Sequence, residues 1–140
     1  MSRADWITPT SHIPIYYSDF SINLDLNPVT GQLRRLTNDE AIKQSMLNLV
    51  LTNISERPYQ PWAGSRIRQS LFENMDSPLT INDMQTSIRD CIEKNEPRAT
   101  ILSLSVTPDY DHNAYSVDLN FSINNITQIF SIQFLISRVR

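Results

Sequence analysis

The sequence predicts an α+β fold: three helices packed on a small antiparallel sheet of C-terminal strands, preceded by an extended N-terminal arm. Three observations lead to this prediction. Apolar residues recur at helical spacing between residues 37 and 95, they alternate at period two from residue 102 onwards, and before residue 37 they follow no sustained helical period. The chain has 140 residues, 40% of them hydrophobic, which is enough to bury one core. We therefore expect an arm over residues 1–36 and a single α+β domain over residues 37–140.

The expected arm is rich in aromatic residues and prolines. Within it Ile22, Leu24 and Leu26 alternate with polar residues, which predicts a short strand or an extended segment. The run Asn-Pro-Val-Thr-Gly at residues 27–31 predicts a turn after that strand. Exposed apolar segments usually pack on something, either their own domain or a neighbouring protein. The sequence leaves both possibilities open.

The first helix is expected to begin at a capping box, in which the Thr37 hydroxyl and the Glu40 side chain satisfy free backbone N–H groups. It should run to about residue 53. One apolar stripe lies along it: Ile42, Met46, Leu49 and Val50.

A second, shorter helix is expected from about residue 65 to residue 74, and a third from Thr80, with Asp83 three residues later. The buried face of the third helix is predicted to contain Met84, Ile88, Cys91 and Ile92. On that face Cys91 is a small core residue rather than a nucleophile.

Strict alternation predicts three antiparallel strands after residue 98. Turn-forming residues separate them at residues 108–113 and 124–125. The inward positions are expected to be Leu102, Leu104 and Val106, then Tyr115, Val117, Leu119, Phe121 and Ile123, and finally Phe130, Ile132, Phe134 and Ile136.

The change from helix to strand occurs at Glu96-Pro97-Arg98. Pro97 has no N–H and pushes the preceding residue out of the helical region, so the third helix must end there. A carboxylate and a guanidinium then flank a rigid peptide. Two interpretations stay open: a solvated turn, or a preorganised charged dock for a partner protein.

Composition argues against several classes of function. A net charge of −3 without a dense run of Lys or Arg argues against nucleic acid as a partner, and two glycines are too few for a phosphate-binding loop. The single cysteine fits a reducing compartment, and we expect neither a membrane span nor a signal peptide. Neither His12 nor His112 has a further ligand at metal-binding spacing. We therefore expect no metal site and no cofactor.

Catalytic motifs are also weak. The sequence has no Gly-x-Ser-x-Gly elbow, and Cys91 has no plausible histidine partner in its sequence context. Glu73 with Asp76 or Asp83 could form an acid/base pair for glycoside hydrolysis, although such carboxylates are more often helix caps. We expect no catalytic residues and no enzymatic activity.

Six short motifs resemble one family in their order along the chain. They are Tyr17-Ser18-Asp19-Phe20, Ala41-Ile42-Lys43-Gln44-Ser45, Glu56-Arg57-Pro58 with Pro61 and Gly64, Leu71-Phe72-Glu73-Asn74, Glu96-Pro97-Arg98, and Pro108-Asp109-Tyr110-Asp111. Together they resemble the small baseplate wedge proteins, or sheath initiators, of contractile-tailed bacteriophages and related type VI secretion baseplates. Trp62 departs from the smaller polar or acidic residue expected there, and the arm before Tyr17 lies outside the resemblance.

The resemblance implies a structural protein of a phage tail baseplate, assembled in the host bacterial cytoplasm and present in several copies of a symmetric assembly. Glu96, Pro97 and Arg98 would bind the core-bundle proteins of the baseplate wedge. The C-terminal strand would template the first ring of tail sheath by strand addition, with Ser131, Gln133 and Leu135 as partner-binding positions. Because some family members carry a lysozyme-like label, a peptidoglycan-degrading glycosidase is the alternative.

Overall fold

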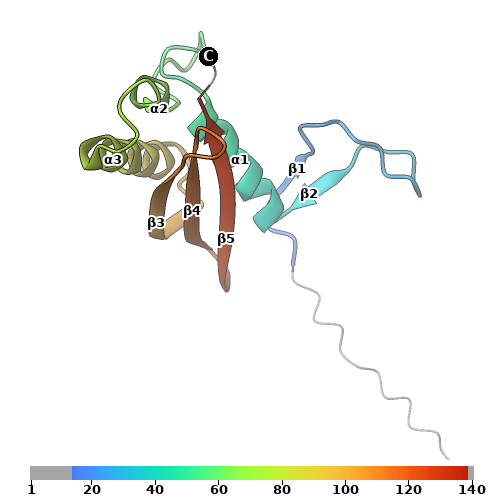
Figure 1. Cartoon of the computed structure of the whole chain (residues 1–140). Helices are drawn as coiled ribbons and strands as arrows, with labels where there is room; N and C mark the ends of the chain where they lie inside the picture. The colour runs from blue at the N-terminus through green and yellow to red at the C-terminus, as the bar shows by residue number, and fades with distance from the viewer. Residues whose placement is uncertain (1–13, 139–140) are drawn as a thin grey trace, which may run out of the picture.

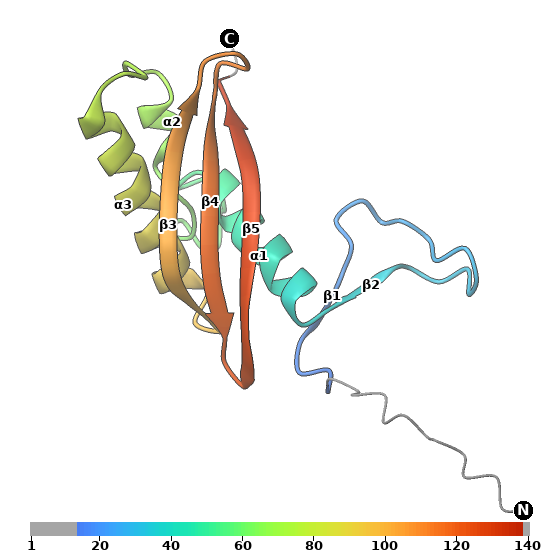
Figure 2. The ribbon, with the colours of Figure 1, turned by 60° about the horizontal axis from the view of Figure 1, so that its bottom comes forward.

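The computed structural model describes residues 14–138. Strands β3, β4 and β5 form one antiparallel sheet in that order, and β1 and β2 pair in a separate two-stranded sheet. Helices α1 and α3 lie against one face of the larger sheet, while the β1–β2 segment projects to one side (Figures 1 and 2). The predicted α+β fold with three helices and a C-terminal antiparallel sheet is confirmed. The elements are β1 Ser18–Phe20, β2 Arg35–Thr37, α1 Asp39–Leu51, α2 Ile67–Ser70, α3 Pro78–Asn95, β3 Ala99–Asp109, β4 Ala114–Ile123 and β5 Ile126–Ser137.

The core lies between the sheet and the helices. The central strand β4 supplies a row of buried side chains, among them the two largest, Tyr115 and Phe121. The side chains of this row alternate as the sequence predicts and are at most 3% exposed: Tyr115, Val117, Leu119, Phe121 and Ile123. They pack against apolar side chains of α1 and α3, namely Ile42, Met46, Val50, Met84, Ile88 and Ile92. Burial of each such side chain contributes roughly 1.5 to 3 kcal/mol. Cys91 is also buried and its thiol donates to the Leu49 carbonyl at 3.5 Å, which confirms its interpretation as a core residue.

The predicted capping box is wrong. Thr37 belongs to β2, and the residue before α1 is Asn38, which has a positive φ of 47° and makes no side-chain cap hydrogen bond. The Asn38 side chain instead accepts from the N–H groups of Tyr16 and Tyr17 and donates to the Pro14 carbonyl. The Asn38 side chain therefore holds the segment before β1 and is not available to cap helix α1.

No strand forms at residues 22–26, where the sequence predicts a short strand or an extended segment; Leu26 makes an isolated antiparallel bridge with Leu33. Ile22, Leu24 and Leu26 are each more than 60% exposed, and Leu24 has a positive φ of 54°. The strands of this segment are β1 and β2, which pair through Ser18↔Thr37 and Phe20↔Arg35. The predicted turn at residues 27–31 is present, closed by a hydrogen bond from the Gly31 N–H to the Asn27 carbonyl at 2.8 Å. The part of the expected arm before Pro14, which contains Trp6, Pro9 and His12, lies outside the described residues.

Helix α2 is shorter than predicted, because tight turns replace the helix after Ser70. Phe72 and Glu73 donate their N–H groups to carbonyls three residues earlier, and the Phe72 side chain is 67% exposed. Helix α3 begins two residues earlier than predicted, with Pro78 in its first turn, where a missing N–H costs nothing.

One predicted inward position of β3 is wrong. Leu102 is 51% exposed, because a bulge between Ile101 and Ser103 adds one residue to β3 opposite β4. The extra residue shifts the alternation. Odd-numbered residues, Ala99 and Ile101, point toward the core before the bulge, and the even-numbered Val106 does so after it.

Gly64 is the glycine that the fold requires most. It has a φ of +141°, and a Cβ at this position would lie 2.6 Å from the carbonyl oxygen of Thr52 and 2.8 Å from the carbonyl carbon of Asn53. We predict that Gly64→Ala lowers the free energy of unfolding by roughly 2 kcal/mol or more, since both the backbone strain and the backbone clash must be relieved. Urea unfolding of the purified chain measures this.

Gly31→Ala is the matched control. Gly31 also has a positive φ, +66°, but a Cβ there meets no atom within 4 Å. Its cost should be limited to about 1 kcal/mol of backbone strain. Equal effects of the two substitutions would show that the contact at Gly64 is not important for stability.

Candidate partner-binding surfaces

The Glu96-Pro97-Arg98 motif lies where α3 ends and β3 begins. Glu96 follows the last residue of α3, and its N–H donates to the Ile92 carbonyl at 2.8 Å. Contrary to the exposed position that a solvated turn implies, Glu96 is only 2% exposed. Its carboxylate accepts from Nε and Nη2 of Arg98, at 2.5 and 2.6 Å, and from the Ser45 hydroxyl of α1 at 2.5 Å. Glu96 therefore faces the domain and not the solvent.

The surroundings of Glu96 favour its charged form. Burial alone would raise the pKa of the Glu96 carboxyl, but the hydrogen bonds from Arg98 and Ser45 and the guanidinium charge outweigh it and lower the pKa below its ordinary value. The carboxylate in turn raises the pKa of Arg98. The two side chains form a charged pair whose negative member is buried and whose positive member reaches the surface.

Arg98 is the charged residue of the motif that a partner can reach, and the neighbouring Pro97 is also exposed. Its side chain is 39% exposed, and the guanidinium carbon lies 5.5 Å from the centre of the Tyr17 ring. Glu96 on one side and the Tyr17 ring on the other fix the orientation of this guanidinium. The segment before β1 is thus part of the same surface as the motif.

Two amide side chains hold the N-terminal segment in this position. Asn38 binds residues 14–17, as described above, while Gln44 of α1 accepts from the Ile22 N–H and donates to the Phe20 carbonyl, both at 2.9 Å. Gln44 therefore satisfies backbone groups on the side of β1 that faces away from β2. Sequence reasoning missed both contacts, although Gln44 and Tyr17 lie within the motifs on which the resemblance depends.

The second candidate surface is the free edge of β5. In an antiparallel pair, residues that exchange hydrogen bonds alternate with residues whose backbone groups point away. Arg138 donates its N–H to the Asn113 carbonyl at 3.1 Å, and the register Ala114↔Ser137 continues without a shift to Ser122↔Ile129. Even-numbered residues from 130 to 136 therefore bond to β4. Odd-numbered residues direct their N–H and C=O groups away from it.

The hydrogen bonds between β4 and β3 confirm which residues of β4 direct their backbone groups toward β5. Asn124 donates its N–H to the Arg98 carbonyl at 3.0 Å, so even-numbered residues of β4 face β3 and odd-numbered ones face β5. Pro108, which has no N–H, pairs with Tyr115, a residue whose backbone this alternation directs toward β5. The assignment of the β5 edge is thus consistent across the sheet.

The three predicted strand positions share this free edge. Ser131, Gln133 and Leu135 are exposed, and the alternation directs the backbone N–H of each away from β4. Among residues 14–138, no strand pairs with β5 on that side. The Gln133 side chain donates to the Ser116 hydroxyl at 3.4 Å, on the face of the sheet opposite the helices.

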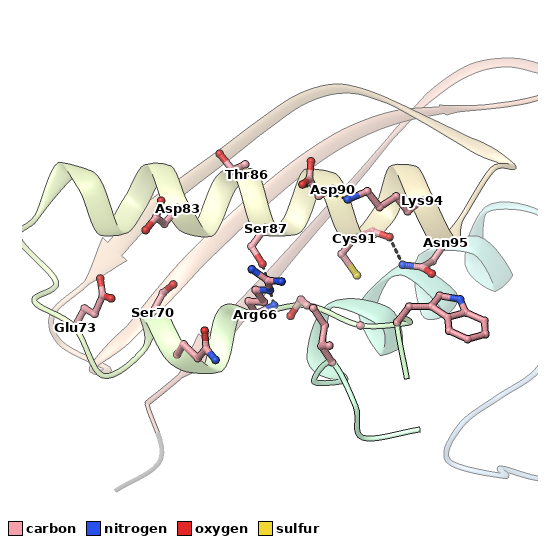
Figure 3. Close-up of a pocket in the computed structure, with 15 residues that line it drawn as sticks. Arg66, Ser70, Glu73, Asp83, Thr86, Ser87, Asp90, Cys91, Lys94 and Asn95 are labelled. Carbon is pink, nitrogen blue, oxygen red and sulfur yellow. Dashed lines mark hydrogen bonds and ion pairs between the residues drawn. The ribbon is translucent and has the colours of Figure 1, made fainter. Parts of the chain in front are cut away.

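A polar groove of about 580 Å³ lies between α2 and α3 (Figure 3). Glu73 and Asp83 both line it, so the structure brings one of the two considered carboxylate pairs into one groove. Asp76 does not line it and instead accepts from the Tyr110 hydroxyl at 2.8 Å. The Glu73 carboxylate accepts from the Thr80 hydroxyl at 3.1 Å.

Other classes of site have little support within residues 14–138. No three His, Cys, Asp or Glu side chains gather there as metal ligands, and His112 instead contacts Asp109, with its Nδ1 2.8 Å from Oδ2. No helix of this part of the chain has the length and apolar character needed to cross a membrane.

Two solved structures share the fold. A Geobacter sulfurreducens protein provisionally assigned as a tail lysozyme superposes with a TM-score of 0.66, covering 73% of this chain and 92% of that protein. A protein of the anti-feeding prophage baseplate superposes with a TM-score of 0.59, covering 89% and 87%. Each is 18% identical to this chain, so these likenesses concern the fold alone.

Sequence comparison gives the family. Baseplate wedge protein gp25 of Enterobacteria phage T4 is 35% identical over 83 residues, which are 59% of this chain and 62% of that relative. The chain thus spans about three fifths of the length of the curated relative. The family model described as baseplate wedge protein gp25 matches residues 37–128, which include all three helices and strands β3 and β4. This chain therefore belongs to the family of baseplate wedge protein gp25.

Proposed function

We propose that this chain is a structural, non-enzymatic component of a contractile phage tail baseplate that recruits the first ring of tail sheath. It docks on the core-bundle proteins of the baseplate wedge through the surface formed by Glu96, Pro97 and Arg98. It then accepts a strand of the sheath protein at the free edge of β5. Several copies act in one symmetric assembly, which forms in the host cytoplasm and ends in the virion tail. The free β5 edge is the observation that carries this proposal.

From residue 129 to residue 137, beyond a register shift near the start of the strand, the β5 edge lacks the features with which proteins usually protect an edge strand. Such strands are commonly short, charged, interrupted by proline or bulged. Strand β5 has 12 residues and contains neither a charged residue nor a proline. The opposite edge, β3, carries both Pro108 and the bulge at Leu102. One edge of the sheet is therefore protected against pairing, and the other is suited to it.

The core is also incomplete on the β5 side. The inward side chains of β4 are fully buried, whereas those of β5 at Phe130, Ile132 and Phe134 are only partly buried. Helix α1 passes behind β5 and extends beyond that edge (Figure 2). A strand added beside β5 would lie over this part of α1 and cover the partly exposed side chains. The expected incoming strand therefore alternates, with apolar side chains toward α1 and polar ones toward solvent.

The geometry of Arg98 supports the docking role. A guanidinium held by a buried carboxylate loses little further entropy when a partner binds it, and this preorganisation favours affinity. In this arrangement Arg98 contacts the partner, Glu96 positions Arg98, and Pro97 fixes the exit from α3.

A reconstitution experiment tests the proposed function. Wedge baseplates assembled without this chain should not support polymerisation of purified sheath protein, and addition of the chain should restore it. The readout is the fraction of baseplates that carry sheath in electron micrographs. Sheath growth of normal frequency on baseplates without the chain would contradict the proposal.

A glycosidase remains the second candidate, because Glu73 and Asp83 line one groove. We predict that the purified chain releases no soluble fragments from peptidoglycan. If a preparation shows lytic activity, Glu73→Gln and Asp83→Asn should leave it unchanged, since the proposal assigns that activity to a contaminant. A clean loss of activity in either folded variant would instead establish the groove as a catalytic site.

A further inference from the structure

We propose that the groove beside Arg98 binds an acidic side chain of the wedge partner, with Arg57 as a second cation and Trp62 as the apolar wall. This inference rests on the proposed docking role of Glu96, Pro97 and Arg98. It adds two specificity-determining residues from a different part of the chain and names the chemical group that they recognise.

The groove has a volume of about 420 Å³ and is formed by segments that are distant in sequence. The β1 strand, helix α1, the loop between α1 and α2, and the end of α3 all contribute. Six residues matter for its chemistry: Asp19, Asn48, Arg57, Trp62, Pro97 and Arg98.

The groove is lined by two arginines, Arg57 and Arg98, and by two carboxylates, Asp19 and Glu96, and one of the arginines has no ion pair within residues 14–138. Arg57 has only a long hydrogen bond, 3.5 Å from its Nη2 to the Thr52 hydroxyl, and forms no ion pair with any carboxylate of residues 14–138. Arg98 uses Nε and Nη2 for Glu96, so Nη1 is left to bind a ligand. Asp19 is the opposing charge, and its carboxylate already accepts from the Phe20 N–H at 2.8 Å. With Glu96 neutralised by Arg98, Arg57 is the cation that lacks a partner.

The loop that carries Arg57 and Trp62 is held in a fixed shape. Its N–H and C=O groups bond within the loop, from Ser55 to Pro61 at 2.7 Å and from Ala63 to Gln60 at 3.0 Å. Ala63 is buried, whereas the neighbouring Trp62 is 68% exposed at the rim of the groove. A rigid loop that presents an exposed Trp beside two arginines has the composition of an interface hot spot.

A carboxylate on a protein partner fits these features best. Two guanidinium groups can bind its oxygens, and the indole can cover the methylene groups beside it. A phosphate of nucleic acid fits less well, because a chain with a net charge of −3 would repel the rest of the polymer.

Incorporation into baseplates tests the groove. Untagged variants compete with tagged wild-type chain during assembly, and the ratio in purified baseplates is measured. Arg57→Glu and Trp62→Ala should each lower incorporation by about tenfold or more, whereas Arg57→Lys should retain it.

Arg68→Glu and Tyr59→Ala are matched controls, since both residues are exposed, neither lines the groove, and both variants should incorporate normally. Circular dichroism confirms that each variant is folded, and Arg57→Gln replaces Arg57→Glu if the latter is not.

The outcomes separate this inference from the docking proposal. If Arg98→Ala is excluded from baseplates while folded Arg57→Gln and Trp62→Ala enter at the wild-type level, the groove inference is wrong and the docking proposal stands. If Arg98→Ala itself enters normally, the docking proposal is wrong.

Second-site suppressors of Arg57→Glu should replace an acidic residue of a wedge protein by a basic one. Suppressors confined to this chain would contradict recognition of a partner carboxylate.

Discussion

Proline at Ser131 or Gln133 is expected to leave the domain folded and to abolish sheath assembly. The backbone N–H of each residue points away from β4, so neither substitution removes a hydrogen bond of the sheet. Both substitutions remove a donor that an incoming strand needs, and the proline ring obstructs its approach. Folded variants should enter baseplates at the wild-type level, because the docking surface is unchanged. The fraction of baseplates with sheath, counted in electron micrographs, should fall nearly to zero.

Three further variants separate backbone from side chain. Ser131→Ala and Gln133→Ala keep the N–H and remove the side chain, so sheath assembly should be normal. Ile132→Pro removes an N–H that bonds to β4, together with a core side chain, and should unfold the domain. Full-length sheaths on baseplates that contain either folded proline variant would rule out strand addition at β5 and leave side-chain docking as the mechanism.

Glu96→Gln is expected to destabilise the domain as well as to impair docking. Loss of one partner of a fully buried ion pair costs about 3 to 5 kcal/mol, and because Arg98 is partly exposed we expect about 2 kcal/mol here. This contrasts with the solvated-turn interpretation, which predicts almost no change in stability. Denaturant unfolding at neutral pH measures the difference. Ser45→Ala, which removes the third hydrogen bond, should show a smaller loss.

The pH dependence of the difference in unfolding free energy between wild type and Glu96→Gln tests whether the charge of Glu96 is its cause. The pKa of the folded Glu96 carboxyl lies below its ordinary value of 4.5. The stabilisation from its ionised form is therefore fully present above the ordinary value and is lost as the pH falls through the lower, folded-state pKa. The gap in unfolding free energy between wild type and Glu96→Gln should shrink over that acidic range. A gap that is independent of pH would assign the effect to packing.

Sequence reasoning succeeded where one periodic pattern determines the structure. The alternation from Tyr115 to Ile123 identified the central strand and its buried face, since a strand with one buried face leaves few alternatives. It failed where a distant residue competes for the same group. The capping box was wrong because Thr37 pairs with Ser18 of β1, while the Asn38 side chain, next to the helix, binds residues 14–17; the bulge at Leu102 has no signal in the local pattern.

The candidate binding surfaces were likewise predictable from the sequence only in part. Proline geometry located the end of α3 at Glu96, but the burial of that carboxylate depends on Ser45, 51 residues earlier, and no local pattern reveals this pair. The β5 strand was predictable, whereas its free edge depends on strand order and on the backbone bonds of Asn113 and Asn124. Arg57 and Trp62 were not selected as site residues, because only the folded loop places them beside Arg98.

A cryo-electron microscopy map of the junction between baseplate and sheath in assembled tails tests the central claim most directly. We expect a fourth strand beside β5, contributed by the sheath protein, with backbone hydrogen bonds to Ser131, Gln133 and Leu135 and apolar side chains over α1. A map in which the sheath protein contacts this chain elsewhere while the β5 edge stays unpaired would contradict the account.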